Sequence, residues 1–483
     1  MKRKRDGRLK SRLVVDGRTQ DRVEAGDIAS PTVSIEAIFA TAVIDASEHR
    51  QVLTIDIEGA YLHAQMEDEV IMELEPALAD IMVTIDSTYS EYVTGRGKIY
   101  VKLIKALYGC IQSALLFNKH VTNVLVNIGY TCNRYDACVL NKTTVGGKQI
   151  TVAIYVDDLK VSSVDKGLIE ELIGELKRVY KNISVNKGTT VQYLGMLFDY
   201  TIADEVTVRM DAGYLQELMD EWDIVQSSPT PAAANLFDID TSSKLLGELD
   251  RKKYHSTVQK LLYLSKRARP DILTAVAFHT TRVKAPTLQD QKKLIRVLNY
   301  LHGSMNLPLR LSAASGSGMC TVTAYVDASY GVHSNDGKGH SGILTSIGSG
   351  PVFAKSSKQK LVARSSTEAE LIALSDATCQ VLWMRNFLAD QGLTVGPAII
   401  KQDNMSTIAM AKKGKSTSKR TKHIAIRYFF VKDRIESNEI KVEYLNTDDM
   451  VADILTKPLQ GAKFFKLRAL LMNEKVHIAG VCW

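Results

Sequence analysis

Carboxylates stand at several points of this 483-residue chain where they could bind metal ions. Asp157 and Asp158 separate two β-rich runs, residues 149–156 and 159–162, which is the pattern of a β-hairpin. Adjacent carboxylates in a tight turn repel each other unless a cation lies between them. Asp is also a favoured turn residue, so an ordinary Asp-rich turn remains the alternative interpretation of this pair.

A third acid, Asp56, lies in a run that alternates as a strand does, residues 52–57. Nucleotidyl transfer needs several carboxylates, because the attacking 3′-hydroxyl must lose a proton and the departing pyrophosphate carries heavy negative charge. Two Mg²⁺ ions about 4 Å apart stabilise both groups, and hard cations prefer carboxylate oxygens. Asp56, Asp157 and Asp158 are therefore candidate ligands for such ions.

Further acids follow strand-like runs in the last third of the chain. Asp327 follows residues 321–326, and Asp403 follows residues 398–402. Acids at the ends of neighbouring strands can again share metal ions.

A long helix is predicted between these two acids, over about residues 367–391, and Gly392 is its expected end. Its first turns carry Glu368 and Glu370. Either glutamate also fits a capping box, with Ser365 or Thr367, so helix capping is the alternative to metal binding.

Composition and charge place the chain among globular proteins of about three domains, with 45% apolar and 24% charged residues. The net charge of +7 permits a polyanionic partner, and basic residues gather at residues 2–18 and 412–422. Solvated segments are the alternative for both clusters.

The six cysteines form no Cys-x-x-Cys pair, which argues against a structural zinc site and favours a reducing compartment. No apolar stretch is long enough to span a membrane.

Two stretches have the composition of linkers. Residues 227–231 contain two prolines, and residues 312–318 are small and flexible. Between them the apolar residues Leu294, Val297 and Leu301 recur with helical spacing, and Gly303 follows as a stop. The middle of the chain is therefore predicted to be helical.

Short motifs in a fixed order resemble the reverse transcriptase–RNase H region of Ty1/copia-type retrotransposon polyproteins, over nearly the whole chain. The motifs of the first part are RLVVDGRTQ (12–20), DIEGAYL (56–62), KALYG (105–109) with Gln112, YVDD (155–158), YLG (193–195), LYL (262–264) and RPDI (269–272). Those of the second part are DAS (327–329), SSTEAEL (365–371), DN (403–404), RTKHI (420–424) and ADILTKP (452–458).

The resemblance implies roles for the residues of the first part. Asp56, Asp157 and Asp158 would hold the metal ions, and the ring of Tyr61 would lie under the incoming sugar and exclude a 2′-hydroxyl. For Tyr61, the alternative is an ordinary half-buried aromatic residue. For Lys10 and Arg12, whose implied contact is given next, the alternative is a surface charge. The remaining implied contacts are Gly109 and Gln112 in the nucleotide pocket, and Lys10 and Arg12 facing the triphosphate.

For the second part, the resemblance implies that Asp327, Glu370, Asp403 and Asp453 are the metal-binding acids of an RNase H site. Glu370 is preferred to Glu368 because Ala-Glu-Leu best matches the RNase H pattern. His423 would assist product release or contact the hybrid, with a surface or packing role as the alternative.

The chain also departs from the family pattern. Where the family has Leu-Lys-Gln-Ala-Pro-Arg-x-Trp after the glycine, residues 110–117 read Cys-Ile-Gln-Ser-Ala-Leu-Leu-Phe. The missing lysine and arginine would weaken contacts to template or nucleotide. A second departure is Tyr-Phe-Phe at residues 428–430, where the family often has Tyr-His-Phe.

The expected fold is a multidomain α+β and α/β protein, a right-hand polymerase with fingers, palm and thumb followed by an RNase H-like domain. The expected domains are fingers and palm at 1–226, a helical thumb or connection at 227–318, the RNase H-like domain at 319–460 and a C-terminal tail at 461–483.

The expected function is that of an RNA-directed DNA polymerase with ribonuclease H activity, an endonuclease acting on RNA–DNA hybrids, in the retrotransposition and DNA integration of a long-terminal-repeat element. Two Mg²⁺ ions per active site are the expected cofactors. The expected partners are an RNA template, a DNA primer, the hybrid and deoxynucleoside triphosphates, with no membrane. The expected location is cytoplasmic, in virus-like particles, with the nucleus as a second location. The alternatives are a catalytically decayed nucleic-acid-binding remnant of such a polyprotein, and a stand-alone RNase H with an unrelated N-terminal domain.

Overall fold

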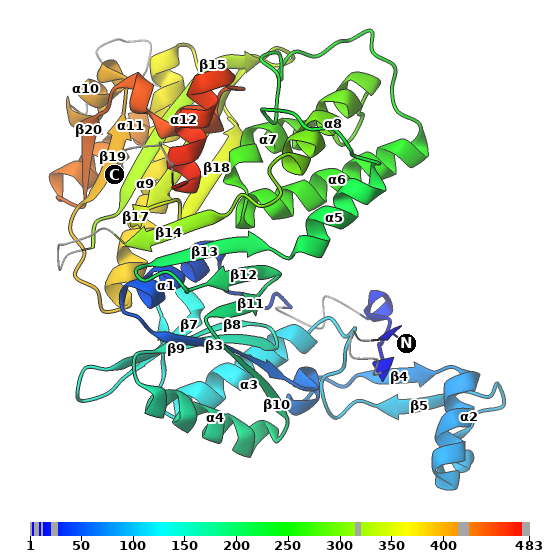
Figure 1. The fold of residues 1–483 in the computed structure, drawn as a ribbon. Coiled ribbons are helices and arrows are strands. Elements are labelled where there is room, and N and C mark those ends of the chain that lie inside the picture. The colour runs from blue at the N-terminus through cyan, green and yellow to red at the C-terminus, as the bar shows by residue number, and fades with distance from the viewer. Residues whose placement is uncertain are drawn as a thin grey trace. The chain divides into compact units, whose positions relative to one another are not determined.

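The computed structural model describes residues 2–3 and 9–10 by their backbone alone, and residues 13–20, 28–313, 320–413 and 425–475 (Figure 1). The chain divides into two compact units, each built from segments that are separate in the sequence. Unit 1 comprises Met1–Val33, Leu53–Cys132 and Ala137–Asn186; unit 2 comprises Ser34–Val52, Asn133–Asp136 and Lys187–Trp483. Both linker-like stretches, 227–231 and 312–318, belong to unit 2, and residues 314–318 lie outside the described part.

Unit 1 is built on a β-sheet with helices α3 (Ser113–Asn127) and α4 (Lys166–Tyr180) along one face (Figure 1). In order across the sheet, the strands are β10 (Ile183–Lys187), β3 (Gln51–Ile57), β9 (Asp158–Ser163), β8 (Gln149–Tyr155), β7 (Asp136–Thr143) and β6 (Thr131–Asn133). The strand predicted at 52–57 and the hairpin predicted around residues 157–158 are both confirmed. The central strands are mostly buried: β8 contributes mainly apolar side chains, whereas β9 also buries the polar residues Lys160, Ser162 and Ser163.

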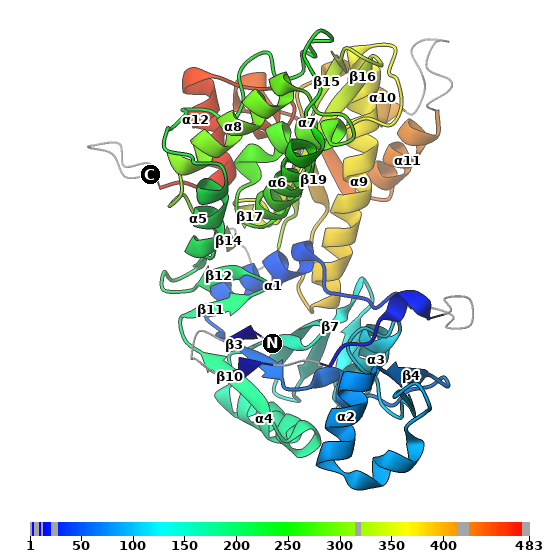
Figure 2. The ribbon, with the colours of Figure 1, turned by 90° about the vertical axis from the view of Figure 1, so that its right-hand side faces the viewer.

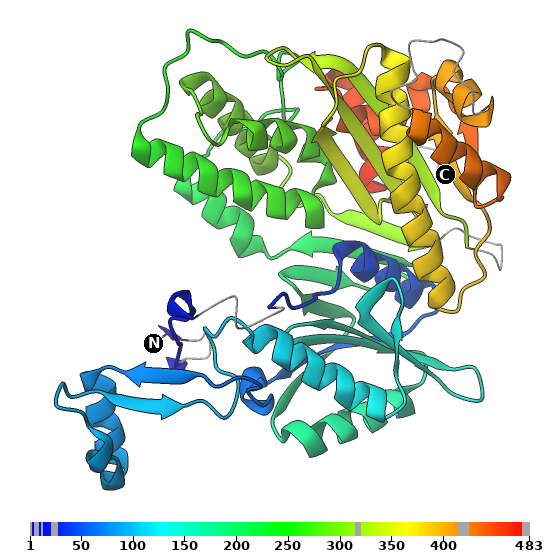
Figure 3. The ribbon, with the colours of Figure 1, turned by 180° about the vertical axis from the view of Figure 1, so that it is seen from behind.

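A small lobe of unit 1 extends away from this sheet, seen from behind in Figure 3. It consists of β4 (Ile71–Leu74), β5 (Ile99–Lys102), α2 (Pro76–Ile85) and the 3-10 helix η3 (Ser87–Tyr92). Met72 and Leu74 on the hairpin pack against Ala79 of α2 and Ile99, which gives the lobe a hydrophobic core of its own.

The first half of unit 2 combines an antiparallel sheet with helices. The strands, in order, are β11 (Thr190–Tyr193), β12 (Met196–Asp199), β13 (Glu205–Met210), β14 (Leu309–Ala313) and β17 (Gly348–Ser349). The helices are α1 (Ile35–Ser47), α5 (Ala212–Glu221), α6 (Glu248–Arg267), α7 (Leu273–Arg282) and α8 (Leu288–His302). The helix predicted from Leu294, Val297 and Leu301 is confirmed as α8, which ends at Gly303 as expected.

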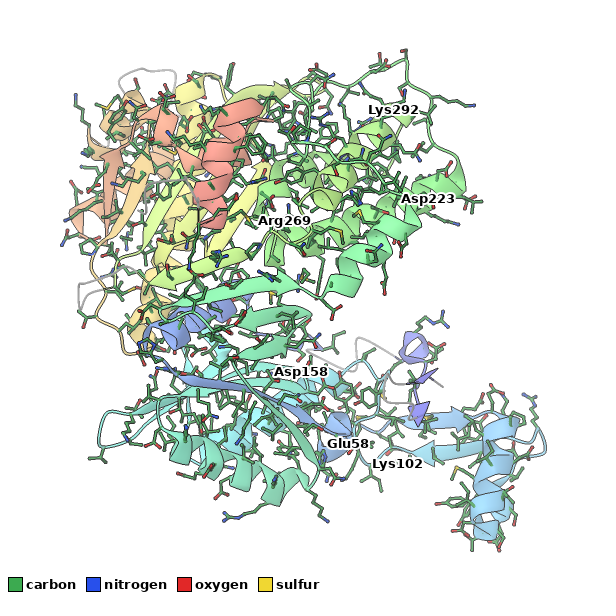
Figure 4. The ribbon with its side chains drawn as sticks, in the orientation of Figure 1. Glu58, Lys102, Asp158, Asp223, Arg269 and Lys292 are labelled. Carbon is green, nitrogen blue, oxygen red and sulfur yellow. The ribbon has the colours of Figure 1, made fainter. Side chains whose placement is uncertain are left out.

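The RPDI motif forms the short connection between α6 and α7. Arg269 is 2% exposed and its guanidinium forms two hydrogen bonds with the Asp271 carboxylate, 2.9 and 2.8 Å long. Tyr300 of α8 donates its hydroxyl to the same carboxylate, and Ser304 accepts from the guanidinium. Because every partner of this buried charge comes from a neighbouring helix or helix end, the motif specifies how α6, α7 and α8 join. Figure 4 labels Arg269 within this helical region.

The second half of unit 2 is built on a mixed sheet. Its strands, in order, are β18 (Phe353–Lys358), β16 (Lys338–Ser346), β15 (Thr323–His333), β19 (Ala398–Gln402) and β20 (Ile440–Tyr444). β15 pairs antiparallel with β16 and parallel with β19. The long predicted helix is confirmed as α9 (Ser366–Asp390), which packs on β15 and β16 (Figure 3). Helices α10 (Met405–Lys413) and α11 (Ala425–Glu436) pack beside it (Figure 2).

Two expectations for this region differ from the structure. The strand expected at 321–326, directly before Asp327, begins at Thr323 and continues through Asp327 to His333, while Cys320 forms an isolated bridge with Val395. Part of the expected tail at 461–483 is the helix α12 (Gly461–Met472), which packs on the 3-10 helix η7 (Val451–Leu455). The helix buries Phe464, Leu467 and Leu471, whose spacing places them on one helix face. Burial of this apolar face stabilises the helix. Among the described residues, no helix has both the length and the apolarity to cross a membrane.

Candidate active sites

The first acidic site is built on the tight turn between β8 and β9. Tyr155 pairs with Asp158 across the hairpin, which leaves Val156 and Asp157 as the two residues of the turn. Val156 has φ +56°, a left-handed conformation that a β-branched residue rarely adopts. The turn therefore holds backbone strain at the residue directly before an acid, as functional sites often do.

Asp56 approaches this turn because β3 neighbours β9 in the sheet. The backbone N–H of Ile57 donates a 3.3 Å hydrogen bond to the carbonyl of Asp157, which ties the end of β3 to the turn. Burial, followed by the charges of Asp157 and Asp56, raises the pKa of Asp158 to about 6. The three acids thus repel one another, and a bound cation would relieve that repulsion. Figure 4 labels Asp158 on the sheet.

Tyr61 lies just beyond the strand that carries Asp56. The chain turns at Gly59, which has φ +65°, and enters the 3-10 helix η2 (Ala60–His63). The half-buried ring of Tyr61 lies 4.5 Å from the ring of Tyr108 and 6.3 Å from that of Phe117, centroid to centroid. Phe117 is fully buried, so the last residue of the altered segment 110–117 supports this aromatic group. The role of Tyr61 in sugar selection stays a prediction.

The segment around Val15 lies directly against the turn at Gly109. Val15 donates its backbone N–H to the carbonyl of Tyr108 at 2.8 Å. Gly109 has φ +97°, and a Cβ added there would lie 1.9 Å from the carbonyl oxygen of Val15. A glycine is therefore required twice over at position 109, by its conformation and by the close approach of the two backbones.

Gln112 is 3% exposed, and its carboxamide is already engaged by other side chains. Its Oε1 accepts a 2.6 Å hydrogen bond from Gln20, and its Nε2 donates one of 3.1 Å to Asp68. Gln20 in turn accepts from the backbone N–H of Ile111 at 3.1 Å. Gln112 thus connects three separate loops, and its contact with a nucleotide stays a prediction. The side chain of Lys10 and the whole of Arg12 lie outside the described residues.

The second acidic site gathers three acids from three elements. Asp327 lies in β15, Asp403 directly follows the parallel strand β19, and Glu370 lies in α9, which packs on β15. One carboxylate oxygen from each lies within 4.8 Å of the others, the only such group of His, Cys, Asp or Glu among the described residues. The structure therefore brings together three of the four acids predicted here.

Glu368, the other candidate on α9, has a capping role. Its backbone N–H donates to the hydroxyl of Ser365, the N-cap residue, and its carboxylate accepts from the backbone N–H of Arg364 at 2.8 Å. The capping interpretation of Glu368 and the preference for Glu370 in the acidic site are consistent with this geometry.

Neighbouring polar residues fix the direction of each clustered carboxylate. Gln402 donates to Glu370 at 3.2 Å, Thr447 donates its hydroxyl to Asp403 at 2.9 Å, and Thr456 donates its hydroxyl to Asp327. Sequence reasoning did not single out these three residues. Thr456 stood inside a recognised motif and Gln402 directly before an acid, whereas Thr447 carried no signal.

The electrostatics of this cluster suit a divalent cation. Burial, followed by the charges of Asp327 and Asp403, raises the pKa of Glu370 to about 9. Burial also raises the pKa of Asp327, against the attraction of Lys457. Clustered carboxylate oxygens are the ligands that Mg²⁺ prefers, and its charge would offset the burial that opposes their ionisation. The residues present therefore fit this ion.

Asp453, the fourth predicted acid, lies in η7 and is fully buried. Its carboxylate is bound by two ammonium groups, Lys457 Nζ at 2.5 Å and Lys463 Nζ at 2.7 Å. It is not part of the close group of three, and its role as a metal ligand stays a prediction. His423 lies outside the described residues.

Comparisons with known proteins agree with the motifs. Residues 1–233 match the family model described as "Reverse transcriptase (RNA-dependent DNA polymerase)". The Pol polyprotein of transposon TNT 1-94 from Nicotiana tabacum is 28% identical over 479 residues, which are 96% of this chain and 34% of that protein. That of transposon RE1 from Arabidopsis thaliana is 28% identical over 466 residues, 95% of this chain and 30% of that protein.

A yeast relative extends the same comparison. The Ty1-GR2 Gag-Pol polyprotein of Saccharomyces cerevisiae is 25% identical over 495 residues, covering 98% of this chain and 26% of that protein. The chain thus spans about a third or less of the length of these relatives. Residues 1–233 thus match a reverse transcriptase model, and the chain is similar over most of its length to the Pol polyproteins of Ty1/copia-type transposons.

Proposed function

We propose that this chain synthesises DNA on an RNA template and cleaves the RNA strand of the resulting hybrid. The observation that carries the proposal is the presence of two separate acidic sites, one on the β8–β9 turn and one on β15, β19 and α9. The first lies within the residues that match the reverse transcriptase model. The second has three clustered carboxylates that could hold a metal ion for hydrolysis of a phosphodiester.

The fold offers candidates for the parts of a right-hand polymerase. The sheet that carries Asp56 and Asp158 would be the palm, and the lobe of β4, β5 and α2 would belong to the fingers, both within residues 1–226. The helices α6, α7 and α8 would form the thumb or connection, at 227–318. The mixed sheet with α9 would be the RNase H-like domain, at 319–460.

At the polymerase site, Asp56, Asp157 and Asp158 would hold Mg²⁺, two ions being expected there. The bound ions would supply positive charge for the 3′-hydroxyl that attacks and the pyrophosphate that leaves. Tyr61 would press its ring against the incoming sugar and exclude a 2′-hydroxyl. Gly109 and Gln112 would border the nucleotide, and Lys10 and Arg12 would face its triphosphate.

At the cleavage site, Asp327, Glu370 and Asp403 would hold Mg²⁺, and Asp453 completes the acidic set. The ion would supply the charge that favours attack by water on the RNA phosphodiester. Gln402, Thr447 and Thr456 keep the carboxylates aligned through the hydrogen bonds described above. His423 would contact the hybrid or assist product release. The proposed place of action, virus-like particles in the cytoplasm and then the nucleus, follows from the family resemblance.

The test uses the purified full chain with Mg²⁺ in two assays, extension of a DNA primer on an RNA template and cleavage of labelled RNA in a preformed hybrid. Asp157→Asn should abolish extension and leave cleavage, whereas Asp403→Asn should abolish cleavage and leave extension. Loss of neither activity in either variant would overturn the assignment of the sites. An unmodified chain that binds the hybrid but performs neither reaction would instead support the hypothesis of a catalytically decayed remnant. The altered segment 110–117 is the observation that favours this hypothesis.

A further inference from the structure

Both carboxylate oxygens of Asp453 are occupied by ammonium groups of the chain itself. Lys457 Nζ lies 2.5 Å from Oδ1 and Lys463 Nζ lies 2.7 Å from Oδ2. Lys457 Nζ also lies 3.4 Å from both carboxylate oxygens of Asp327. Lys457 therefore bridges Asp453 to a member of the three-acid group.

The fold fixes the origin of both lysines. Lys457 follows η7 closely, and its backbone N–H donates to the carbonyl of Asp453 at 2.9 Å. Lys463 lies in the first turn of α12, which packs on η7 and has the buried side chains Phe464, Leu467 and Leu471. The two cations thus come from backbone that is packed against the site, although their side chains remain 38% and 39% exposed.

Counting the charges indicates how many ions the site can hold. When ionised, Asp327, Glu370, Asp403 and Asp453 carry four negative charges, and the two lysines carry two positive ones. The net charge of these six side chains is then −2, which a single divalent cation neutralises. A second divalent ion would leave an excess of positive charge among side chains that are 0–6% exposed for three of the four acids, and unbalanced buried charge is costly.

We propose, resting on the RNA cleavage proposed above, that Lys457 takes the place of a second divalent cation in this site. The chain then binds one resident ion through Asp327, Glu370 and Asp403. Asp453 is the anchor that holds Lys457 beside Asp327, and it is not a ligand of that ion. Lys457 is a positioning residue, acting on the ion through the Asp327 carboxylate.

The count of ions is measured by calorimetric titration of the full chain with Mn²⁺ in the absence of nucleic acid. An Asp157→Asn, Asp158→Asn background weakens binding at the polymerase site, so differences between variants report on the second site. Lys457→Met, which keeps the length of the side chain without its charge, should raise the number of bound ions by one. Lys457→Arg should restore the original number.

A matched control exists on α12. Lys466 forms the same kind of ion pair, 2.8 Å from Asp449, but with a partner outside the acidic group. Lys466→Met should therefore leave the number of bound ions unchanged. Melting temperatures of all variants, measured without metal, show whether each retains the fold.

A second comparison leaves Lys457 itself unchanged. Asp453→Asn should change the affinity for the first ion by less than about threefold, whereas Asp403→Asn should lower it by at least about tenfold, because only Asp403 is a ligand. Equal losses in the two variants, or two ions bound at this site in the chain with Lys457 intact, would overturn the proposal. A chain that binds one ion as described and fails to cleave the hybrid would refute the proposed cleavage alone.

Discussion

The ring of Tyr61 lies 4.5 Å from the ring of Tyr108, centroid to centroid, at an interplanar angle of 46°. The contact joins two motifs that are far apart in the sequence, since Tyr61 follows the strand of Asp56 and Tyr108 precedes Gly109. Phe117 supports Tyr61 from α3. Because aromatic neighbours restrict the ring, Tyr61 can act as a rigid wall and not as a mobile side chain.

We therefore expect Tyr61→Val to relax discrimination between sugars. Removing the ring opens space for a 2′-hydroxyl, so the ratio of ribonucleotide to deoxyribonucleotide incorporation should rise at least about tenfold, or about 1.4 kcal/mol of discrimination. Single-nucleotide primer extension with each triphosphate measures this ratio. Tyr61→Phe is the control and should keep the ratio of the unmodified chain; an unchanged ratio in Tyr61→Val would contradict the assigned role.

Gly109→Ala should disrupt the contact between the segment around Val15 and the turn before α3. The added Cβ would overlap the Val15 carbonyl at 1.9 Å, and φ +97° is strained for alanine. We expect a loss of stability in unit 1 of about 2 kcal/mol and reduced primer extension, with hybrid cleavage preserved. Gly95→Ala adds a Cβ that meets nothing within 4 Å and serves as the matched control in thermal unfolding. Equal melting temperatures for the two variants would refute the close approach.

At Val156, whose backbone is left-handed, a substitution is expected to keep or raise the stability of the chain, in contrast to Gly109→Ala. Glycine adopts φ +56° without steric cost, so Val156→Gly should relieve about 1–2 kcal/mol of strain, against up to about 1 kcal/mol of added chain entropy in the unfolded state. The melting temperature should stay level or rise. In Val156→Pro the proline ring fixes φ at about −65°, so this variant should have a lower melting temperature and no primer extension. If Val156→Gly destabilised the chain as much as Val156→Pro, the turn conformation described here would be wrong.

Local sequence signals predicted the elements that carry the acids. The alternation at 52–57, the two β-rich runs around residues 157–158 and the long helical run from residue 367 each specify structure over a few neighbouring residues. Three of the acids placed in the second site come together. Asp403 follows its strand as expected, but Asp327 lies within β15, and the parallel register of Tyr325 with Lys401 brings it level with Asp403.

Long-range partners could not be predicted from one sequence. Gln112 meets Gln20 and Asp68, which are 92 and 44 residues away, and no local pattern records such pairs. Of the two lysines on Asp453, Lys457 stood inside the motif at 452–458 without an assigned role, and Lys463 was missed for a different reason. The apolar spacing of Phe464, Leu467 and Leu471 was present in the sequence, but the segment was interpreted as a tail, so Lys463 had no element to place it.

Glu370→Gln should stabilise the metal-free chain, increasingly so as the pH rises. With a folded-state pKa of about 9 against an ordinary glutamate value of about 4.3, the folded state keeps a proton that the unfolded state releases. Because of Glu370, the free energy of unfolding falls as the pH rises between these two pKa values, by at most about 1.4 kcal/mol per pH unit. Glutamine does not ionise, so the variant lacks this pH-dependent loss of stability. Melting temperatures of both proteins in EDTA should converge near pH 4.5 and separate towards pH 9. Glu436→Gln makes the same chemical change on the surface, where the glutamate pairs with Lys432, and should show no widening difference. Saturating Mg²⁺ should reverse the order at pH 8, because the ion stabilises the ionised Glu370; a gap that is independent of pH and of Mg²⁺ would show that Glu370 is not held neutral in the metal-free site.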